Sequence, residues 1–338
     1  MIGWYFLFGA LALLVSVLLF GFVGCPAFSE APSSLDYPTT IKKTKDLVAY
    51  WRLGDVPSAS GGGTGDMKDS VGAFDGFHHQ YPSPITTPDN IQHSPTSTAK
   101  LIYGATPGLL ELLPSSACLD LEGGWVLIPF NDRLNPPQFT LEAWVSPDPF
   151  IDKGFFYCLA QSAGPGGSGQ QKTGWGLYLG PDDPNKTPPG DHFWQVWMGD
   201  GSQFKRIAIA KGTDCPTKLQ LTYLALTFDG TSVQLWLYYP HTGQTLDNQH
   251  VQGAQHNVTT FKRNDTSPDG HGPVIIGAGN PLFPGGGPFS LPLYPFKGKI
   301  QEVALYKRDL SVPTTAGLPN NTGVWDTLAA HEMSGGNL

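Results

Sequence analysis

The sequence is poor in charged side chains, which make up only 14% of its 338 residues. The formal net charge is −8 and no cluster of Lys and Arg stands out, so we do not expect a nucleic-acid-binding surface. Long amphipathic helical patterns are also missing, which argues against βαβ units. Present instead are 42 Gly, 31 Pro and 12% aromatic residues. This composition favours an all-β protein with many turns.

Cysteine is scarce as well, with Cys25, Cys118, Cys158 and Cys215 in the whole chain. No C-x-x-C pair occurs, so a zinc or thioredoxin-type site is not expected. Cys25 adjoins the apolar N-terminus, which leaves three cysteines for the body. One disulfide and one thiol would be the simplest arrangement in an oxidising compartment, and Cys158 with Cys215 is the pairing we favour. Buried free cysteines are the alternative.

The longest apolar run, residues 4–23, contains no charge and is long enough to cross a bilayer as a helix. A secretory signal would have a basic start and a shorter apolar core, so we expect an uncleaved transmembrane anchor. Gly9, Ala12 and Ser16 form a small-residue stripe against which another membrane helix could pack. Two alternatives remain: residues 22–25 resemble a lipoprotein box with Cys25 lipidated, or the chain is cleaved near Ser29. Each places the body outside the cytoplasm, in the periplasm or at the cell surface.

We therefore divide the chain into an anchor or signal segment at 1–25, a Pro/Ser/Thr-rich linker at 26–45 and a folded body at 46–338. The central segment of the body is Phe139–Asp148. Its odd-numbered residues from Phe139 to Val145 are apolar, whereas Glu142 and Trp144 lie together on the other side. This period of two predicts a strand with one face in a core.

About a dozen similar short strands are expected between turn signals, which favours a sandwich or barrel. Asp229-Gly230 lies between two alternating apolar runs and predicts a hairpin. Gly123-Gly124 joins 118–121 to 125–129 and predicts another. The remaining strands are expected near residues 46–53, 155–161, 175–179, 192–198, 204–210, 219–228, 233–239, 274–277 and 296–306.

The order of these segments resembles the LamG-like branch of the concanavalin A-like jelly-roll proteins. The resemblance rests on a series of landmarks: 50–53, 69–72, 119–128, 139–145, 224–230 and 296–311. It implies an antiparallel β-sandwich, here preceded by one N-terminal transmembrane helix. The family usually has an Asp where this chain has Gln301, and residues 240–272 and 281–295 resemble insertions. The second insertion is apolar and aromatic, which indicates either a contact surface or a loop folded over the end of the sandwich.

Calcium is the one cofactor that the resemblance suggests, with Asp69 as the first candidate ligand and Glu302 or Asp120 supplementing it. Asp69 could equally form a surface turn. Glycoside hydrolysis needs two carboxylates across a cleft, and the Glu-x-Asp-x-Glu strand typical of such enzymes is absent. We therefore expect a protein that is not an enzyme.

Our first functional hypothesis is a membrane-tethered interaction module, an accessory or scaffold subunit docked on a membrane complex such as a respiratory or photosynthetic assembly. The alternative is a lectin-like, glycan-binding surface protein in which tryptophans stack on sugars, and a hydrolase ranks third. The residues that we expect at a recognition surface are Glu142, Trp144, Phe283, Phe289 and Tyr294. For Glu142 and Trp144, we expect a structural role first and a recognition role second.

Overall fold

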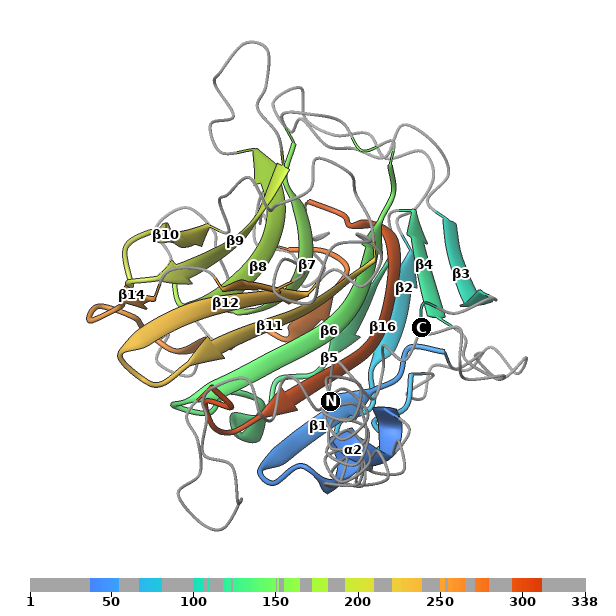
Figure 1. Cartoon of the computed structure of the whole chain (residues 1–338), viewed down its shortest axis with the longest axis horizontal. Helices are drawn as coiled ribbons and strands as arrows, with labels where there is room; N and C mark the ends of the chain where they lie inside the picture. The colour runs from blue at the N-terminus through green and yellow to red at the C-terminus, as the bar shows by residue number, and fades with distance from the viewer. Residues whose placement is uncertain are drawn as a thin grey trace, which may run out of the picture. The chain divides into compact units, whose positions relative to one another are not determined.

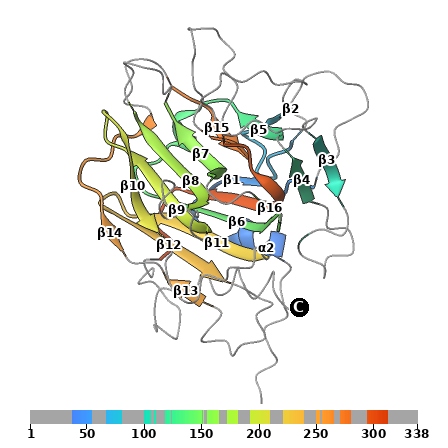
Figure 2. The same cartoon turned by 90° about the horizontal axis from the view of Figure 1, so that it is seen from above.

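The computed structural model describes residues 37–54, 67–80, 100–105, 109, 118–122, 124–149, 151, 155–164, 172–181, 192–209, 221–238, 250–252, 255–264, 271–279 and 294–311. These residues form two antiparallel sheets that face each other, with one short helix beside the first sheet (Figures 1 and 2). The prediction of an all-β antiparallel sandwich is confirmed.

The first sheet has nine strands within the described residues. In spatial order it contains β13 (His250–Gln252), β12 (Ser232–Tyr238), β11 (Thr222–Phe228), β6 (Phe139–Pro147), β16 (Lys297–Tyr306), β4 (Cys118–Glu122) and β3 (Lys100–Ala105). Two further strands, β1 (Leu47–Trp51) and β14 (His256–Asn257), pair with β16 and β12. We call this the nine-stranded sheet.

The second sheet has seven strands in the described part of the chain. Its order is β10 (Phe204–Ile209), β9 (His192–Gly199), β8 (Gly174–Pro181), β7 (Tyr157–Ala163), β15 (Val274–Ile276), β5 (Gly124–Ile128) and β2 (Phe77–Gln80). A short 3-10 helix, η1 (Asp132–Leu134), lies between β5 and β6 in the chain. We call this the seven-stranded sheet.

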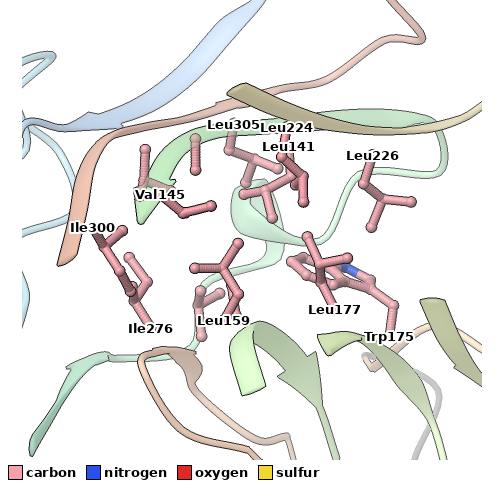
Figure 3. Packing of buried hydrophobic residues seen from close by; sticks show 14 of the residues in the cluster. Leu141, Val145, Leu159, Trp175, Leu177, Leu224, Leu226, Ile276, Ile300 and Leu305 are labelled. Atoms are coloured by element: carbon pink, nitrogen blue, oxygen red, sulfur yellow. The ribbon is translucent and has the colours of Figure 1, made fainter. Parts of the chain in front are cut away.

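Alternation along each strand builds the core between the sheets. The apolar, odd-numbered residues of β6 belong to one buried cluster with Leu224 and Leu226 of β11 and with Leu177 of β8. Figure 3 shows these side chains pointing toward one another from the two layers. Burial of such side chains is worth about 1.5–3 kcal/mol each relative to exposure, so the core is the main source of stability. The predicted core face of β6 is confirmed.

The Asp229-Gly230 turn is also confirmed, because β11 and β12 pair directly across it. Gly230 has a φ of 98°, a conformation that side chains with a Cβ rarely adopt. The carboxylate of Asp229 accepts N–H bonds from Thr231 at 2.7 Å and Ser232 at 2.6 Å. The turn therefore satisfies its own backbone donors.

The predicted hairpin at Gly123-Gly124 is wrong. The strand before it, β4, pairs with β16 and β3 in the nine-stranded sheet, whereas β5 pairs with β15 and β2 in the seven-stranded sheet. The two strands belong to opposite layers, so the chain crosses from one sheet to the other between β4 and β5.

The helix α2 (Tyr37–Lys43) lies within the stretch that we assigned to the linker. Tyr37 and Ile41 are fully buried, and they pack in a second apolar cluster with Trp144, Tyr223 and Trp236. These three partners point away from the main core, so α2 covers the outer face of the nine-stranded sheet. The compact folded unit accordingly begins at Tyr37.

Cys158 is a buried free thiol, so the predicted disulfide between Cys158 and Cys215 is not formed in this structure. Its partner in that prediction, Cys215, lies outside the described residues. Burial raises the pKa of Cys158 and raises the pKa of Cys118 to about 11, so neither thiol ionises readily at neutral pH.

None of the helices that the structure describes has the length and apolarity needed to cross a membrane. The predicted span at 4–23, with its Gly9, Ala12 and Ser16 stripe and the adjoining Cys25, lies outside the described residues. The anchor therefore stays a prediction from the sequence.

Candidate functional site

Glu142 is fully buried on the outer side of β6, beneath α2. Its carboxylate accepts hydrogen bonds from the hydroxyls of Tyr223 at 2.5 Å, Tyr306 at 2.8 Å and Tyr37 at 3.4 Å. Three phenol donors offset much of the cost of burying a carboxylate. Glu142 therefore holds α2 and two strands together, and it does not reach a ligand surface.

Trp144 lies beside Glu142 on the same side of the strand and is also fully buried. Its ring meets Tyr223 at a centroid distance of 5.3 Å and Tyr37 at 6.2 Å. The indole Nε1 has no hydrogen-bond partner within the described residues. A covered indole cannot stack on a sugar, so the structure gives Trp144 a packing role.

Asp69 forms a turn, the alternative that its sequence context left open. Its two carboxylate oxygens accept four backbone N–H bonds of 2.9–3.1 Å, from Tyr50, Val71, Ala73 and Phe74. Because these donors occupy the oxygens, they oppose the approach of a cation.

Glu302 sits at a β-bulge in β16 with a φ of 58°. It is fully buried, accepts a short hydrogen bond from the Tyr50 hydroxyl, and pairs with Arg52 at 3.1 Å. Burial raises the pKa of Glu302, and the Arg52 guanidinium opposes that rise.

The third candidate calcium ligand, Asp120, pairs with Lys299 of β16 and Ile102 of β3. No group of three or more His, Cys, Asp or Glu side chains capable of holding a metal occurs among the described residues. The described structure does not bring the three predicted ligands together in one such group, and calcium binding stays a prediction from the sequence.

Tyr294 is the predicted surface residue that does line an opening, whereas Phe283 and Phe289 fall outside the described residues. The opening is a pocket of about 110 Å³. It is lined by five aromatic side chains, which we call the aromatic pocket: Phe156, Tyr178, Trp197, Phe204 and Tyr294.

Strand periodicity explains why three of these rings share one surface. In β8, Leu177 and Leu179 point into the core, so Tyr178 points outward. In β9, Val196 and Met198 point inward, so Trp197 points outward. Phe204 belongs to the neighbouring edge strand β10. The pocket thus lies on the outer face of the seven-stranded sheet.

Two glycines of β8 leave room for the rings. A Cβ at Gly180 would lie 2.1 Å from the Phe156 ring, and one at Gly176 would lie 2.5 Å from the Tyr178 ring. These contacts are far below van der Waals distance, so both rings lie flat over bare backbone. The Gly-x-x-x-Gly spacing in this strand is therefore part of the pocket.

Four of the rings form a closed cycle. Phe156 contacts Trp197 at a centroid distance of 5.7 Å, Trp197 contacts Tyr178 at 6.1 Å, Tyr178 contacts Tyr294 at 5.9 Å, and Tyr294 contacts Phe156 at 6.3 Å. The angles between adjacent ring planes are 85°, 66°, 83° and 86° in the same order. Each ring therefore presents an edge to its neighbour, a favourable arrangement for aromatic pairs.

Two polar side chains are relevant to the pocket: Trp197, which lines it, and Gln195, which stands opposite Tyr178 in the strand pairing. The Nε1 of Trp197 and the Oε1 of Gln195 have no hydrogen-bond partner in the part of the chain that the structure describes. The Nε2 of Gln195 donates to the carbonyls of Gly180 at 2.7 Å and Pro181 at 2.9 Å, which fixes the amide. Buried polar atoms are usually satisfied, so unused ones beside a pocket are candidates for ligand contacts.

The two tyrosines stay neutral over a wide pH range. Burial raises the pKa of Tyr178, and the adjacent Cys158 raises it further. Burial also raises the pKa of Tyr294. The pocket is thus lined by uncharged rings, and no carboxylate is among the lining residues that the structure describes.

Comparison with known families places this architecture. The model described as the concanavalin A-like lectin/glucanases superfamily matches residues 120–314, more than half of the chain. The chain belongs to this superfamily. The LamG-like resemblance is therefore confirmed. In this member of the concanavalin A-like superfamily, the aromatic pocket lies on the seven-stranded sheet, whereas α2 covers the nine-stranded sheet. A search of the curated proteins finds no match.

Several solved structures are similar to the chain at low identity. Domain 4 of AbnA, an extracellular arabinanase from Geobacillus stearothermophilus in complex with arabinotriose, has 14% identity and a TM-score of 0.42, covering 78% of this chain and 93% of its own. The sialidase CBM40 of Ruminococcus gnavus, bound to sialyllactose, has 17% identity and a TM-score of 0.35, covering 53% and 80%. The binding domain of botulinum neurotoxin DC has 7% identity and a TM-score of 0.41, covering 78% and 48%.

The pocket residues were only partly predictable. Trp197 is one of several tryptophans that the glycan-binding hypothesis expected to stack on sugars. The other four lining residues lie far from Tyr294 in the sequence, so no local pattern linked them to it. The signal that could have separated Trp197 from Trp194 is periodicity. The two lie three apart on one strand and so point to opposite faces.

Proposed function

We propose that this protein is a non-catalytic, lectin-like binding module that recognises carbohydrate through the aromatic pocket. The observation that carries the proposal is a pocket on the outer face of the seven-stranded sheet whose described lining residues are all aromatic. Membership of the concanavalin A-like lectin/glucanases superfamily supports a carbohydrate ligand. Small-ligand pockets are typically apolar and aromatic with a few polar groups, as here.

Burial of the acids supports binding rather than hydrolysis. Retaining and inverting glycosidases need two carboxylates about 5–10 Å apart that reach the same bond of the substrate. Glu142 and Glu302 are fully buried and engaged by tyrosine and arginine donors. Neither acid can reach a polysaccharide, which is why we assign no catalytic residue.

A glycan array of the full-length protein, with and without calcium, would test the proposal. Any glycan that binds would be titrated by calorimetry against the parent, Trp197→Ala and Phe130→Ala. Phe130 is the matched control, since it stacks on His271 at 4.4 Å and does not line the pocket. We expect Trp197→Ala to weaken binding at least tenfold, equivalent to about 1.4 kcal/mol. No binding on the array, or equal affinity in Trp197→Ala, would contradict the proposal.

We also propose that the module is tethered to a membrane, as an accessory subunit of a membrane complex. The charge-free run at 4–23 in the sequence supports this second role. Mild detergent extraction followed by native gel separation would test it. Migration of the protein alone, at the mass of a monomer, would contradict the accessory role. N-terminal mass analysis would separate an intact anchor from a lipidated Cys25 and from a cleaved chain.

A further inference from the structure

The four-ring cycle of the aromatic pocket differs from a flat stacking platform. A sugar or base stacks on one exposed ring face or on coplanar faces, but adjacent rings here meet at 66–86°. Rings that stand roughly perpendicular around a common space enclose it from several sides. Such a space favours a compact, rounded group over a flat one.

The size of the cycle suits a single cationic head group. The four ring centroids form a quadrilateral with sides of 5.7–6.3 Å. The midpoint of this quadrilateral lies on average about 4 Å from each centroid, whether or not the four centroids are coplanar. A cation is attracted by an aromatic face within about 6 Å of the ring centroid. One group at the midpoint would therefore lie within that distance of all four ring centroids.

The charges around the pocket bear on which cation it could take. Among the described lining residues there is no Lys, Arg or carboxylate, and the chain has a formal net charge of −8. Two cations follow Phe204 along β10: Lys205 is paired with Asp200 at 2.7 Å, whereas Arg206 is exposed and stands opposite Trp197 in the strand pairing. The attraction would therefore come from the rings and not from charged neighbours, which favours a weakly hydrated cation over ammonium or a metal ion.

We propose that the aromatic pocket binds an N-alkylated ammonium group, of the trimethylammonium type. This inference rests on the proposed function because it uses the same pocket, and it names the chemical group that enters it. The group would sit among the faces of Phe156, Tyr178, Trp197 and Tyr294, with the rest of the ligand leaving over the half-buried edge near Phe204. A glycan that carries a choline-type substituent satisfies both proposals.

Titration of the full-length protein with choline and with its neutral isostere 3,3-dimethyl-1-butanol would test the inference. The two differ in charge and hardly in shape, so cation–π attraction predicts at least tenfold tighter binding of choline. Trp197→Leu and Tyr294→Leu keep an apolar lining but remove a ring face, and each should weaken choline binding at least tenfold. Phe130→Leu should leave it unchanged.

Two further arms identify the source of the group, and both use free small molecules: phosphocholine and Nε-trimethyllysine. Tighter binding of the first would point to a choline-bearing glycoconjugate or lipid, and of the second to a modified protein. Equal binding of choline and its isostere, or no binding of choline, would overturn the inference.

The outcomes also separate the two proposals. If a neutral glycan binds in a manner sensitive to Trp197→Ala while choline does not bind, the inference fails and the lectin-like function stands. If choline binds in the pocket while no glycan binds, the inference stands and the carbohydrate proposal fails. Circular dichroism and the unfolding midpoint of each variant would show that any lost binding is not lost folding.

Discussion

At the scale of single residues, the buried acids show how carboxylates persist inside a sandwich. Glu142 receives three tyrosine hydroxyls, and Glu302 receives Tyr50, Arg52 and Gln301. Leaving such a group without donors would cost about 1–3 kcal/mol or more. Both acids therefore stabilise the fold only as long as their partners are present.

Replacement of Arg52 by Met should give a pH-dependent loss of stability. The pKa of Glu302 in the folded protein is raised above 4.5. Its contribution to the free energy of unfolding is therefore complete in acid and is lost as pH rises through the folded pKa. Arg52 lowers the pKa of Glu302, so removal of Arg52 raises that pKa further. The pH range over which stability is lost then becomes wider. We expect Arg52→Met to cost little at pH 4 and about 1–3 kcal/mol at pH 7, measured from urea unfolding midpoints.

The matched control for that measurement is Lys68→Met, which breaks the exposed Lys68–Asp75 pair. An exposed pair is worth about 0–1 kcal/mol, so the control should change little. A loss in Arg52→Met that is the same at pH 4 and pH 7 would contradict the account given for Glu302.

Sequence alternation sufficed to predict which side of β6 faces the core, because a strand has a period of two. It did not show that the other side would also be buried. The donors to Glu142 come from positions as distant as Tyr37 and Tyr306, and no local pattern links such residues. This is why Glu142 and Trp144 retained a second role as surface residues in the sequence-based hypothesis.

At the scale of elements, α2 illustrates tertiary packing that overrides local preference. A seven-residue helix is marginal by itself, because helix nucleation is costly. Its sequence contains Pro38 and two threonines, and it lies in a stretch typical of a linker. The burial of Tyr37 and Ile41 over Trp144 supplies the energy that local propensity lacks.

Ile41→Ala should therefore destabilise the whole body by about 2–4 kcal/mol, since it removes a fully buried branched side chain. Chemical unfolding would measure the loss, and acrylamide quenching should show a newly accessible tryptophan. Lys42→Ala, on the exposed side of the same helix, is the control and should stay within about 0.5 kcal/mol of the parent. Equal effects of the two substitutions would mean that α2 is not packed on the sheet.

The crossing between β4 and β5 shows where element-level prediction reaches its limit. Two glycines between apolar runs are typical of a hairpin, but pairing is decided by partners elsewhere in the chain. The partner of β4 is β16, which begins at Lys297, and no local signal specifies that choice. Most strands could thus be predicted one by one, although β2, β3, β13 and β14 were not expected. The assignment of strands to sheets could not be predicted.

At the scale of the whole molecule, the two outer faces of the sandwich have different roles. The outer face of the nine-stranded sheet is covered by α2 and the cluster around Trp144. The outer face of the seven-stranded sheet carries the aromatic pocket. The core between them separates the α2 packing on one side from the proposed ligand-binding pocket on the other.

This separation predicts that substitutions on the two outer faces change the free energy of unfolding additively. Sites without shared partners usually add within about 0.3–0.5 kcal/mol. The double variant Ile41→Ala/Trp197→Ala should lose the sum of the two single losses in unfolding free energy, and Ile41→Ala alone should leave ligand affinity unchanged below its unfolding transition. An interaction energy above about 1 kcal/mol would show that the two faces are coupled through the core.

The position of α2 has a practical consequence for handling the protein. The described body begins at Tyr37 and its last strand, β16, ends at Tyr306, and both elements belong to the covered side of the sandwich. The first element and the last strand of the described body therefore both lie on the side away from the rings. Attachment to a bead or sensor chip through the start of this body would leave the aromatic surface turned toward the solution, where a soluble ligand can reach it.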